Sequence, residues 1–384
     1  MRLIPFLEQK PLYYDVIDYS RMPKAYECIK QYIKLPKIIH VVGTNGKGST
    51  GRFLANILLN KGISVGHYTS PHIFKFNERI WVNGKNIDDK TLEDAHIKLQ
   101  KILPENFIET LSYFEYTTFL AMLVFSDECE YVVLEAGLGG EHDATNVFPK
   151  ILSIVTPIGY DHQSFLGNSI EEIATTKLNS ITKEAVISRQ YEEIVYDYAK
   201  KIATEKSAKL YFVENILLEY ESEMIATYVK DNNLPGFQKI NLQTAYCAAK
   251  ILGFDDNIDI ANLGMMEGRC QKVAKNVTID VGHNKMAALA MVKYFNNKKV
   301  NLVYNSFKDK EFKDILHILF PIVKRVELLY MENPRKMATE EIIKICKDAN
   351  VDITDFKNIK DDEEYLVFGS FVVVEKFMKG LRER

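Results

Sequence analysis

The sequence of 384 residues lacks any run that approaches about 18 apolar residues, and its first residues lack the apolar stretch of a secretion signal. Its five cysteines are scattered, without the paired spacing of a disulfide framework or a cysteine-ligated zinc site. The formal net charge of -3 gives no electrostatic reason to expect nucleic acid or an anionic membrane as a partner. These absences argue against the membrane, disulfide-rich and nucleic-acid-binding classes, and we expect a cytoplasmic protein.

What the sequence does contain is typical of a soluble globular protein, with 47% hydrophobic and 26% charged residues. Short apolar, β-branched segments alternate with helical spacing in two parts of the chain, as in α/β domains with a parallel sheet. We predict a doubly wound parallel-sheet domain over residues 1–271 and a smaller Rossmann-like α/β domain over residues 272–384. Strands are expected at 38–42, 63–68, 131–135 and 151–156, and again at 277–281, 300–304, 326–330 and 365–368.

Helical spacing predicts the remaining elements, except in residues 207–231. There the apolar residues alternate, which predicts a small antiparallel insert with strands at 210–213 and 225–229. Asn83-Gly84 is the signal of a tight hairpin. Helices are expected at 14–19, 25–33, 53–61, 90–102, 115–125 and 240–252.

A glycine-rich loop, Gly43-Thr-Asn-Gly-Lys-Gly-Ser49, follows the first buried strand and leads into a helix. Such a loop lets backbone N–H groups surround phosphate oxygens, while a lysine such as Lys47 reaches the outer phosphates. The usual P-loop has glycine where Val41 stands and serine or threonine where Gly48 stands. The alternative is an ordinary turn between strand and helix, but the strand–loop–helix context favours a P-loop.

Polar side chains follow the neighbouring strands, where the ligand crevice of an open α/β sheet lies. Ser70, Glu135 and His162 stand near such strand ends, together with Lys47, and a carboxylate in this place can hold Mg²⁺. Each of them alone is more often a solvated loop residue, but four around one phosphate loop favour a site.

Lys177 lies on the inward stripe of a helix that begins at a Ser169–Glu172 capping box. Its stem either snorkels to the surface or keeps a partly buried amine of depressed pKa, able to react with substrate or CO₂. In the second domain, Asp280 and His283 stand where a strand turns into a helix, suited to a ribose hydroxyl and a phosphate. The glycines at 137–140 are not a dinucleotide fingerprint, because position 142 is histidine.

The ordered set of motifs resembles the folylpolyglutamate synthase/dihydrofolate synthase family, a branch of the Mur ligase superfamily. The motifs are Gly43 to Ser49, Tyr68-Thr-Ser-Pro71, Phe76-Asn-Glu-Arg79, Glu135-Ala-Gly-Leu-Gly-Gly140, Asp143-Ala-Thr-Asn146, Asp161-His-Gln163, Gly236-Phe-Gln238 with Asn241, Gly268-Arg269, Asp280 to Asn284, Asp309-Lys310 and Gly369-Ser370.

This resemblance implies an ATP-dependent, Mg²⁺-requiring amide ligase that joins L-glutamate to dihydropteroate, to the γ-glutamyl tail of a reduced folate, or to both, through an acyl phosphate. It implies a Mur-ligase-type ATP-binding domain followed by a C-terminal ligase domain. Lys177 matches the lysine that the family carries as a carbamate. The implied site consists of Lys47, Lys177 and His162 as catalytic residues; Thr44, Asn45, Gly46, Lys47, Gly48, Ser49, Thr50, Asn241, Arg269, Asp280 and His283 on ATP; Ser70, Glu135 and His162 on the metal; and Phe76, Arg79, Asp309, Lys310 and Ser370 on folate or glutamate.

Two other functions fit parts of the pattern. A cell-wall Mur ligase acting on a UDP-sugar peptide shares the phosphate loop, but no UDP-binding domain precedes that loop here. A P-loop NTPase that moves or switches a partner would leave the second α/β domain and Lys177 without a role. We expect a monomer, because no segment suggests a dimer seam, and the sequence leaves open which of the two synthase reactions occurs.

Overall fold

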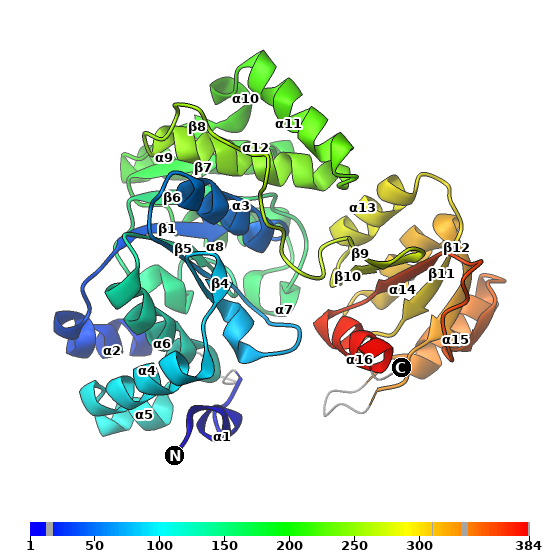
Figure 1. The fold of residues 1–384 in the computed structure, drawn as a ribbon, viewed down its shortest axis with the longest axis horizontal. Helices are drawn as coiled ribbons and strands as arrows, with labels where there is room; N and C mark the ends of the chain where they lie inside the picture. The colour runs from blue at the N-terminus through cyan, green and yellow to red at the C-terminus, as the bar shows by residue number, and fades with distance from the viewer. Residues whose placement is uncertain (13–17, 309, 332–336, 383–384) are drawn as a thin grey trace. The chain divides into compact units, whose positions relative to one another are not determined.

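The computed structural model describes residues 1–12, 18–308, 310–331 and 337–382. Contacts divide the chain into two compact units, Met1–Ile225 with Ile240–Gly264, and Ala226–Lys239 with Met265–Arg384 (Figure 1). Within the described ranges, no helix is long and apolar enough to cross a membrane. The expected helix at 14–19 falls largely outside the described residues, and Asp309 lies outside them.

The first unit is built on an eight-stranded sheet with the order β4-β3-β2-β5-β1-β6-β7-β8. The six strands from β2 to β8 in this order are parallel, as predicted, and the antiparallel part is the hairpin β3–β4 beside β2. Asn83 and Gly84 form its turn with φ of 46° and 98°. The strands are β1 Lys37–Val42, β2 Val65–Tyr68, β3 Ile80–Val82, β4 Lys85–Asn86, β5 Tyr131–Glu135, β6 Leu152–Val155, β7 Glu184–Ile187 and β8 Lys209–Phe212.

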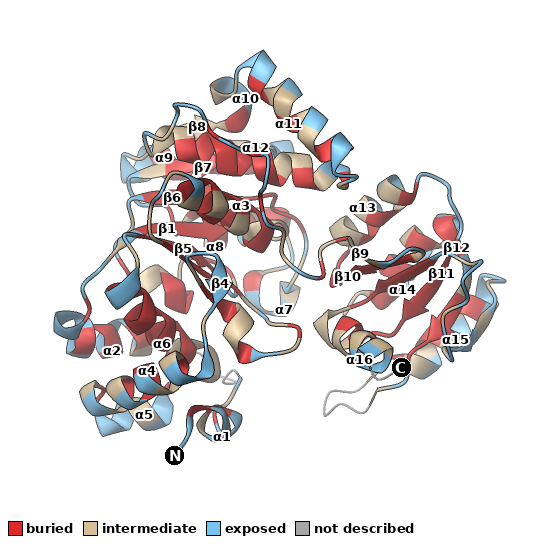
Figure 2. Cartoon of the chain, viewed as in Figure 1, coloured by how far each residue is buried: buried red, intermediate tan, exposed pale blue. Residues whose placement is uncertain are grey.

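Helices cover both faces of this sheet. Ile38 and Val132 pack in a core with the early helices, and Val42 packs in a second core with α8 and α9. Ile38 and Val42 are four residues apart in β1 and therefore point to the same face of the sheet, which the early helices, α8 and α9 cover. Helix α3 lies against Val133 on the opposite face. Figure 2 shows the buried residues along the strands between these layers. The helices are α1 Leu3–Glu8, α2 Arg21–Ile29, α3 Lys47–Asn60, α4 Asp89–Ile102, α5 Glu105–Thr110, α6 Tyr113–Glu128, α7 Gln163–Leu166, α8 Ile170–Leu178, α9 Glu193–Lys206, α10 Val213–Ile216, α11 Glu219–Asp231 and α12 Gly236–Ile251.

The prediction of a small antiparallel insert at residues 207–231 is wrong. Its first half is β8, which runs parallel to β7, and its second half lies in α11. Ile225 and Val229 are 0% and 7% exposed, and residues four apart lie on one face of a helix. Five alternating residues were therefore too few to separate a strand from a helix with a narrow apolar stripe.

The second unit has a six-stranded sheet in the order β13-β12-β11-β14-β10-β9, parallel except for β9. The Rossmann-like prediction is thus confirmed.

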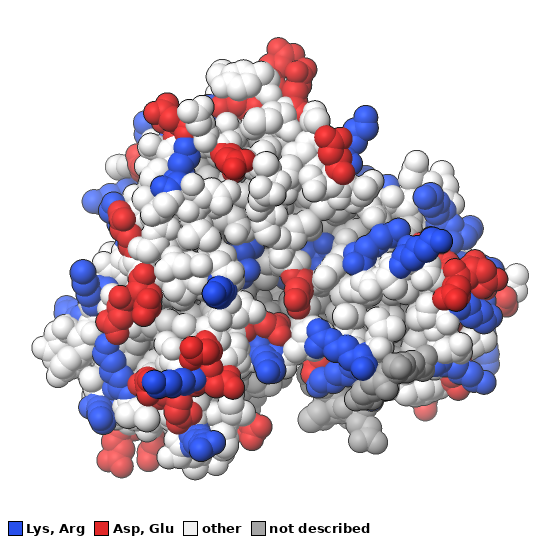
Figure 3. Space-filling model, in the orientation of Figure 1, with Lys and Arg blue, Asp and Glu red and all other residues white. Residues whose placement is uncertain are grey.

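On the face in Figure 3, basic and acidic side chains of described residues are interspersed, in keeping with the net charge of -3. The elements are β9 Gln271–Ala274, β10 Val277–Asp280, α13 Lys285–Phe295, β11 Val300–Tyr304, α14 Phe312–Leu319, β12 Val323–Leu328, α15 Thr339–Asp348, β13 Ile353–Asp355, β14 Tyr365–Phe368 and α16 Phe371–Arg382.

Gly51→Ala should destabilise the first unit, because α3 lies so close to β2. A Cβ at Gly51 would stand 2.6 Å from Nε2 of His67, a fully buried ring whose Nδ1 accepts a hydrogen bond from Arg52. Overpacking of this kind costs about 1–3 kcal/mol, measurable in the thermal unfolding of the purified protein. The same change in a His67→Ala background should cost less, and an equal cost in both backgrounds would contradict the contact.

Candidate functional site

The glycine-rich loop is held open at the end of β1 by contacts to the segment after β6. The N–H of Thr44 donates to the carbonyl of Pro157 at 3.0 Å, and the Thr44 hydroxyl donates to the carbonyl of Gly159 at 2.9 Å. Gly46 has a φ of 88° and precedes α3, whose first turn no side chain caps. No capping side chain therefore occupies the first N–H groups of α3, which is what an anion-binding loop requires.

Asn241 of α12 lies against this loop. A Cβ at Gly46 would stand 2.4 Å from its Oδ1, and Asn241 is 3% exposed. Ser49 and Thr50 are buried in the first turns of α3, and the Thr50 hydroxyl has no hydrogen-bond partner among the described residues. Asn241 and the loop thus meet at one place, although about 190 residues separate them in the sequence.

Two lysines converge on a single carbonyl of the loop. The Nζ of Lys47 donates to the carbonyls of Gly43 at 3.3 Å and Thr44 at 3.1 Å, and the Nζ of Lys177 donates to the same Gly43 carbonyl at 2.9 Å. The predicted Ser169–Glu172 capping box starts α8 and places Lys177 inward, 5% exposed.

Burial, together with the charge of Lys47 and against the opposing charges of Asp161 and Asp143, lowers the pKa of Lys177 to about 7. The amine of Lys177 is therefore available in its neutral, nucleophilic form near neutral pH. The roles of Asp143 and Asp161 were missed, although both stand in quoted motifs.

Glu135 ends β5 in a pocket of oxygen atoms. It is 4% exposed, and its Oε2 accepts hydrogen bonds from the Thr69 hydroxyl and, at 3.3 Å, from the Ser70 N–H. Among the described residues both bonds reach Oε2, which leaves Oε1 for a cation. Carboxylate and hydroxyl oxygens are the ligands that Mg²⁺ prefers, so these residues fit that ion. Thr69 is a further residue that the sequence reasoning did not single out.

His162 follows β6 in a left-handed conformation with a φ of 53°. Its N–H donates to Oδ1 of Asp161 at 2.9 Å, and 40% of its side chain is exposed. Because β2, β5, β1 and β6 are consecutive in the sheet, Ser70, Glu135, Lys47 and His162 follow neighbouring strand ends. The structure thus places all four at the same edge.

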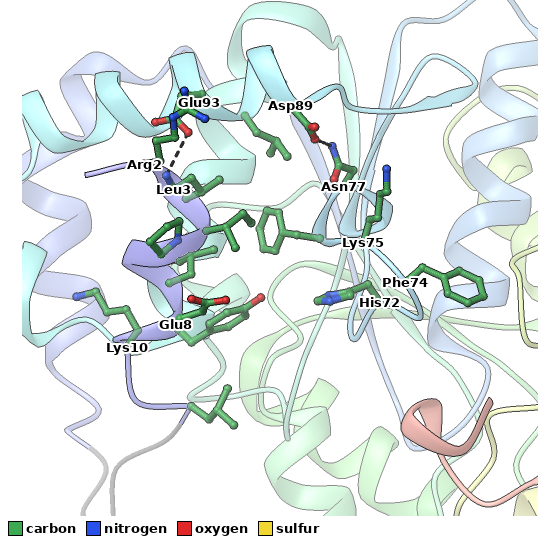
Figure 4. Close-up of a pocket in the computed structure, with 17 residues that line it drawn as sticks. Arg2, Leu3, Glu8, Lys10, His72, Phe74, Lys75, Asn77, Asp89 and Glu93 are labelled. Carbon is green, nitrogen blue, oxygen red and sulfur yellow. Dashed lines mark hydrogen bonds between the residues drawn. The ribbon is translucent and has the colours of Figure 1, made fainter. Parts of the chain in front are cut away.

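Residues 72–79, which include His72, Phe74 and Phe76, form one side of a groove of about 910 Å³ (Figure 4). The carboxylate of Glu78 accepts three backbone N–H groups, of residues 73, 74 and 75, which fixes the loop. Arg79 donates to Nδ1 of His72 at 2.8 Å and stacks over Phe76 and Tyr113. Burial, aided by Arg79, lowers the pKa of His72 to about 4, so His72 is neutral.

Phe76 and Arg79 were predicted from their motif, whereas His72 and Tyr113 were not. The groove carries charges of both signs, and Asn77 donates to Asp89 along its rim (Figure 4). It is lined by Arg2, Leu3, Ile4, Pro5, Leu7, Glu8, Lys10, Leu12, His72, Phe74, Lys75, Phe76, Asn77, Asp89, Leu92, Glu93 and Tyr113.

In the second unit, Asp280 is buried at the end of β10. Its carboxylate accepts the N–H groups of Cys270 at 2.8 Å and Gly282 at 2.7 Å, which holds the chain around Arg269. Burial raises the pKa of Asp280, while Arg269 opposes that shift. The carboxylate is therefore occupied by backbone groups here.

The other predicted residues of the second unit lie near the carboxyl ends of its strands. Nδ1 of His283 lies 3.2 Å from the carbonyl of Val281, and Ser370 caps α16 through a hydrogen bond from Val373. Lys310 is half-buried in the segment after β11, and its N–H donates to Phe307.

No family model matches the chain. A dihydrofolate synthase/folylpolyglutamate synthase of Buchnera aphidicola subsp. Acyrthosiphon pisum is 30% identical over 98% of this chain and 96% of its own length. The enzyme of that name from Haemophilus influenzae is 29% identical over 94% and 92%. The crystal structure of Helicobacter pylori folylpolyglutamate synthetase is 38% identical, with a TM-score of 0.77 over 99% of this chain and 98% of that one.

Gly46→Ala should weaken binding of MgADP about tenfold, since left-handed strain alone costs about 1–2 kcal/mol and the new methyl would displace Asn241. Isothermal titration calorimetry measures the affinity. Gly264→Ala is the matched control, because a Cβ there meets no atom closer than 3.5 Å. Equal affinities for the two variants would show that the loop does not bind nucleotide.

Proposed function

Because the chain belongs to the dihydrofolate synthase/folylpolyglutamate synthase family, we propose that it is an ATP-dependent ligase that joins L-glutamate to dihydropteroate, to the γ-glutamyl tail of a reduced folate, or to both. The observation that carries this proposal is the pair of lysines on the Gly43 carbonyl. A nucleotide switch needs one lysine at its phosphate loop, whereas a second, buried lysine of low pKa suits a site that also makes a bond.

In this reaction the acceptor's carboxylate oxygen attacks the γ-phosphorus of ATP, and ADP leaves. The amine of glutamate then attacks the acyl carbon, the amide bond forms, and phosphate leaves. The N–H groups at the start of α3 and the ammonium of Lys47 would bind the phosphates and oppose the charge of the transferring group. Lys47 must move off its carbonyl partners to do so.

Ser70, Glu135 and His162, which follow β2, β5 and β6 at the same edge of the sheet, are the residues that would hold Mg²⁺. The ion would supply charge neutralisation at the transferring phosphoryl group. Glu135 is held for this purpose by Thr69 and by the Ser70 N–H. The metal and catalytic roles of these residues remain predictions.

Lys177 has the features of a carbamylated lysine. In the neutral form its Nζ can attack CO₂, which forms an N–C bond and releases one proton to water, leaving an anion in place of a cation. Burial favours the neutral amine that reacts, and the charge of Lys47 favours the product, because the carbamate anion would face an ammonium group. The contact with the Gly43 carbonyl would then be lost.

The groove beside residues 72–79 supports binding of the acceptor. The rings of His72, Phe74 and Tyr113, which line the groove and are not fully buried, can pack against a fused heteroaromatic ring. The buried guanidinium of Arg79 lies over Phe76 and Tyr113 and supports those rings. The assignments of Lys310, Ser370 and Asp309 to folate or glutamate, and of Arg269, Asp280 and His283 to ATP, remain predictions. So do the functional boundaries 1–271 and 272–384, the monomeric state and the cytoplasmic location.

Phosphate release from MgATP should require L-glutamate together with an acceptor. The assay compares dihydropteroate with tetrahydrofolate, and the acceptor that supports turnover identifies which of the two reactions occurs. Hydrolysis that is indifferent to glutamate would favour the nucleotide switch, and turnover only with a UDP-sugar peptide would favour the cell-wall ligases.

Lys177→Ala should abolish this turnover, because it removes the amine that a carbamate needs. Short carboxylic acids such as acetate, added at millimolar concentration, should partly restore activity by filling the space with an anion. Lys183→Ala, which changes an exposed lysine beyond the same helix, serves as the control and should be unaffected. Full activity of Lys177→Ala would exclude the carbamate.

A further inference from the structure

Lys150 is a partly buried lysine of the first unit, outside the residues assigned so far. It lies between the turn Ala144–Val147 and β6. Its Nζ donates to Nδ1 of His40 at 3.2 Å, to the carbonyl of Ser180 at 2.9 Å, and to Oδ1 of Asn146. Three acceptors require three N–H groups, so the bonds are complete only when Lys150 is an ammonium ion.

His40 extends these contacts into the core. It is fully buried on β1, three residues before Gly43, and its Nε2 lies 2.8 Å from Oγ1 of Thr145. Oγ1 of Thr145 donates to Oδ1 of Asp143 at 2.5 Å. The Thr145 oxygen must then accept from Nε2–H of His40, which leaves Nδ1 as the acceptor for Lys150. Every donor in the series points from Lys150 towards Asp143.

The contact between Lys150 and Ser180 reaches the end of the helix that carries Lys177. Ser180 lies just beyond α8, and its hydroxyl donates to the carbonyl of Lys177 at 2.7 Å. Lys150 thus joins the end of α8 to β1, the strand that leads into the phosphate loop. The hydrogen bond from Lys177 to Gly43 spans the same two elements.

From this geometry we infer that Lys150 is a positioning residue, which holds α8 against β1 so that Lys177 meets the phosphate loop, and which supports the buried charge of Asp143 through His40 and Thr145. The inference rests on the proposed function for its catalytic consequence. A neutral apolar side chain at this position would leave the three acceptors, which are partly buried, without a hydrogen-bond donor.

Lys206 offers a matched control at the same helix end. Its Nζ donates to the carbonyls of Asn179 and Ile181, but it does not contact His40 or Asn146. The charged groups around Lys150 are Lys206 on α9 and Asp143 on the loop after β5, with neutral His40 on β1. Burial lowers the pKa of Lys150 to about 7, so its third N–H is lost as the pH rises above that value.

The test compares Lys150→Met, Lys150→Arg and Lys206→Met in the glutamate-dependent assay. Lys150→Met should lower kcat about tenfold or more, with little change in the KM for ATP, because a small displacement of Lys177 affects the chemical step. Lys206→Met should stay within about twofold of the wild type. Lys150→Arg should keep most of the activity, since an arginine stays charged and can donate to the same acceptors.

An unchanged kcat in Lys150→Met, or an equal loss in Lys206→Met, would overturn the inference. If Lys150→Met does not fold, His40→Gln and His40→Leu decide. Glutamine can accept from Lys150 and donate to Thr145, so only the leucine variant should lose activity, and equal activities would overturn the inference.

Hydrogen exchange separates this inference from the proposed function. Residues 175–181 should exchange faster in Lys150→Met than in Lys206→Met, whether or not the wild type ligates glutamate. Exchange in Lys150→Met that equals the wild-type exchange would show that Lys150 does not hold α8.

Discussion

The carbonyl of Gly43 accepts hydrogen bonds from two lysines, and the charge balance around the phosphate loop depends on this shared contact. Lys47 comes from the start of α3, and Lys177 comes from α8, so the contact ties three elements together. Burial is the main cause of the low pKa of Lys177, and the charge of Lys47 beside the same carbonyl contributes to it. The loop is therefore prepared for negative charge, from phosphate, from a modified lysine, or from both.

The order of the strands explains why so many polar groups lie near this carbonyl. β2, β5, β1 and β6 are neighbours and parallel, so their carboxyl ends bring Ser70, Glu135, the phosphate loop and His162 to one edge. Buried polar side chains below that edge hold its carboxylates in place through hydrogen bonds. Glu135 is held by Thr69, and Asp143 is supported by Thr145 and His40, so the edge keeps its charges in fixed places.

Long, strongly patterned segments could be predicted from the sequence, and segments with two interpretations could not. The phosphate loop, the end of β5 and the inward Lys177 followed from strand–loop–helix order and a capping box. Ile225 and Val229 were assigned to a strand, because a spacing of four fits either element over so short a stretch. The contacts of Lys150 could not be predicted, because its partners His40 and Ser180 are far from it in the sequence and come close only in the folded sheet.

The most direct test of the role given to Lys177 is carbon-13 NMR of the protein equilibrated with ¹³C-bicarbonate, since it observes the modified lysine without an assay of turnover. We expect a carbamate resonance in the wild type that grows as the pH rises through about 7 and is absent from Lys177→Ala. A wild-type spectrum identical to that of Lys177→Ala would contradict it and leave Lys177 as a cation of the phosphate loop.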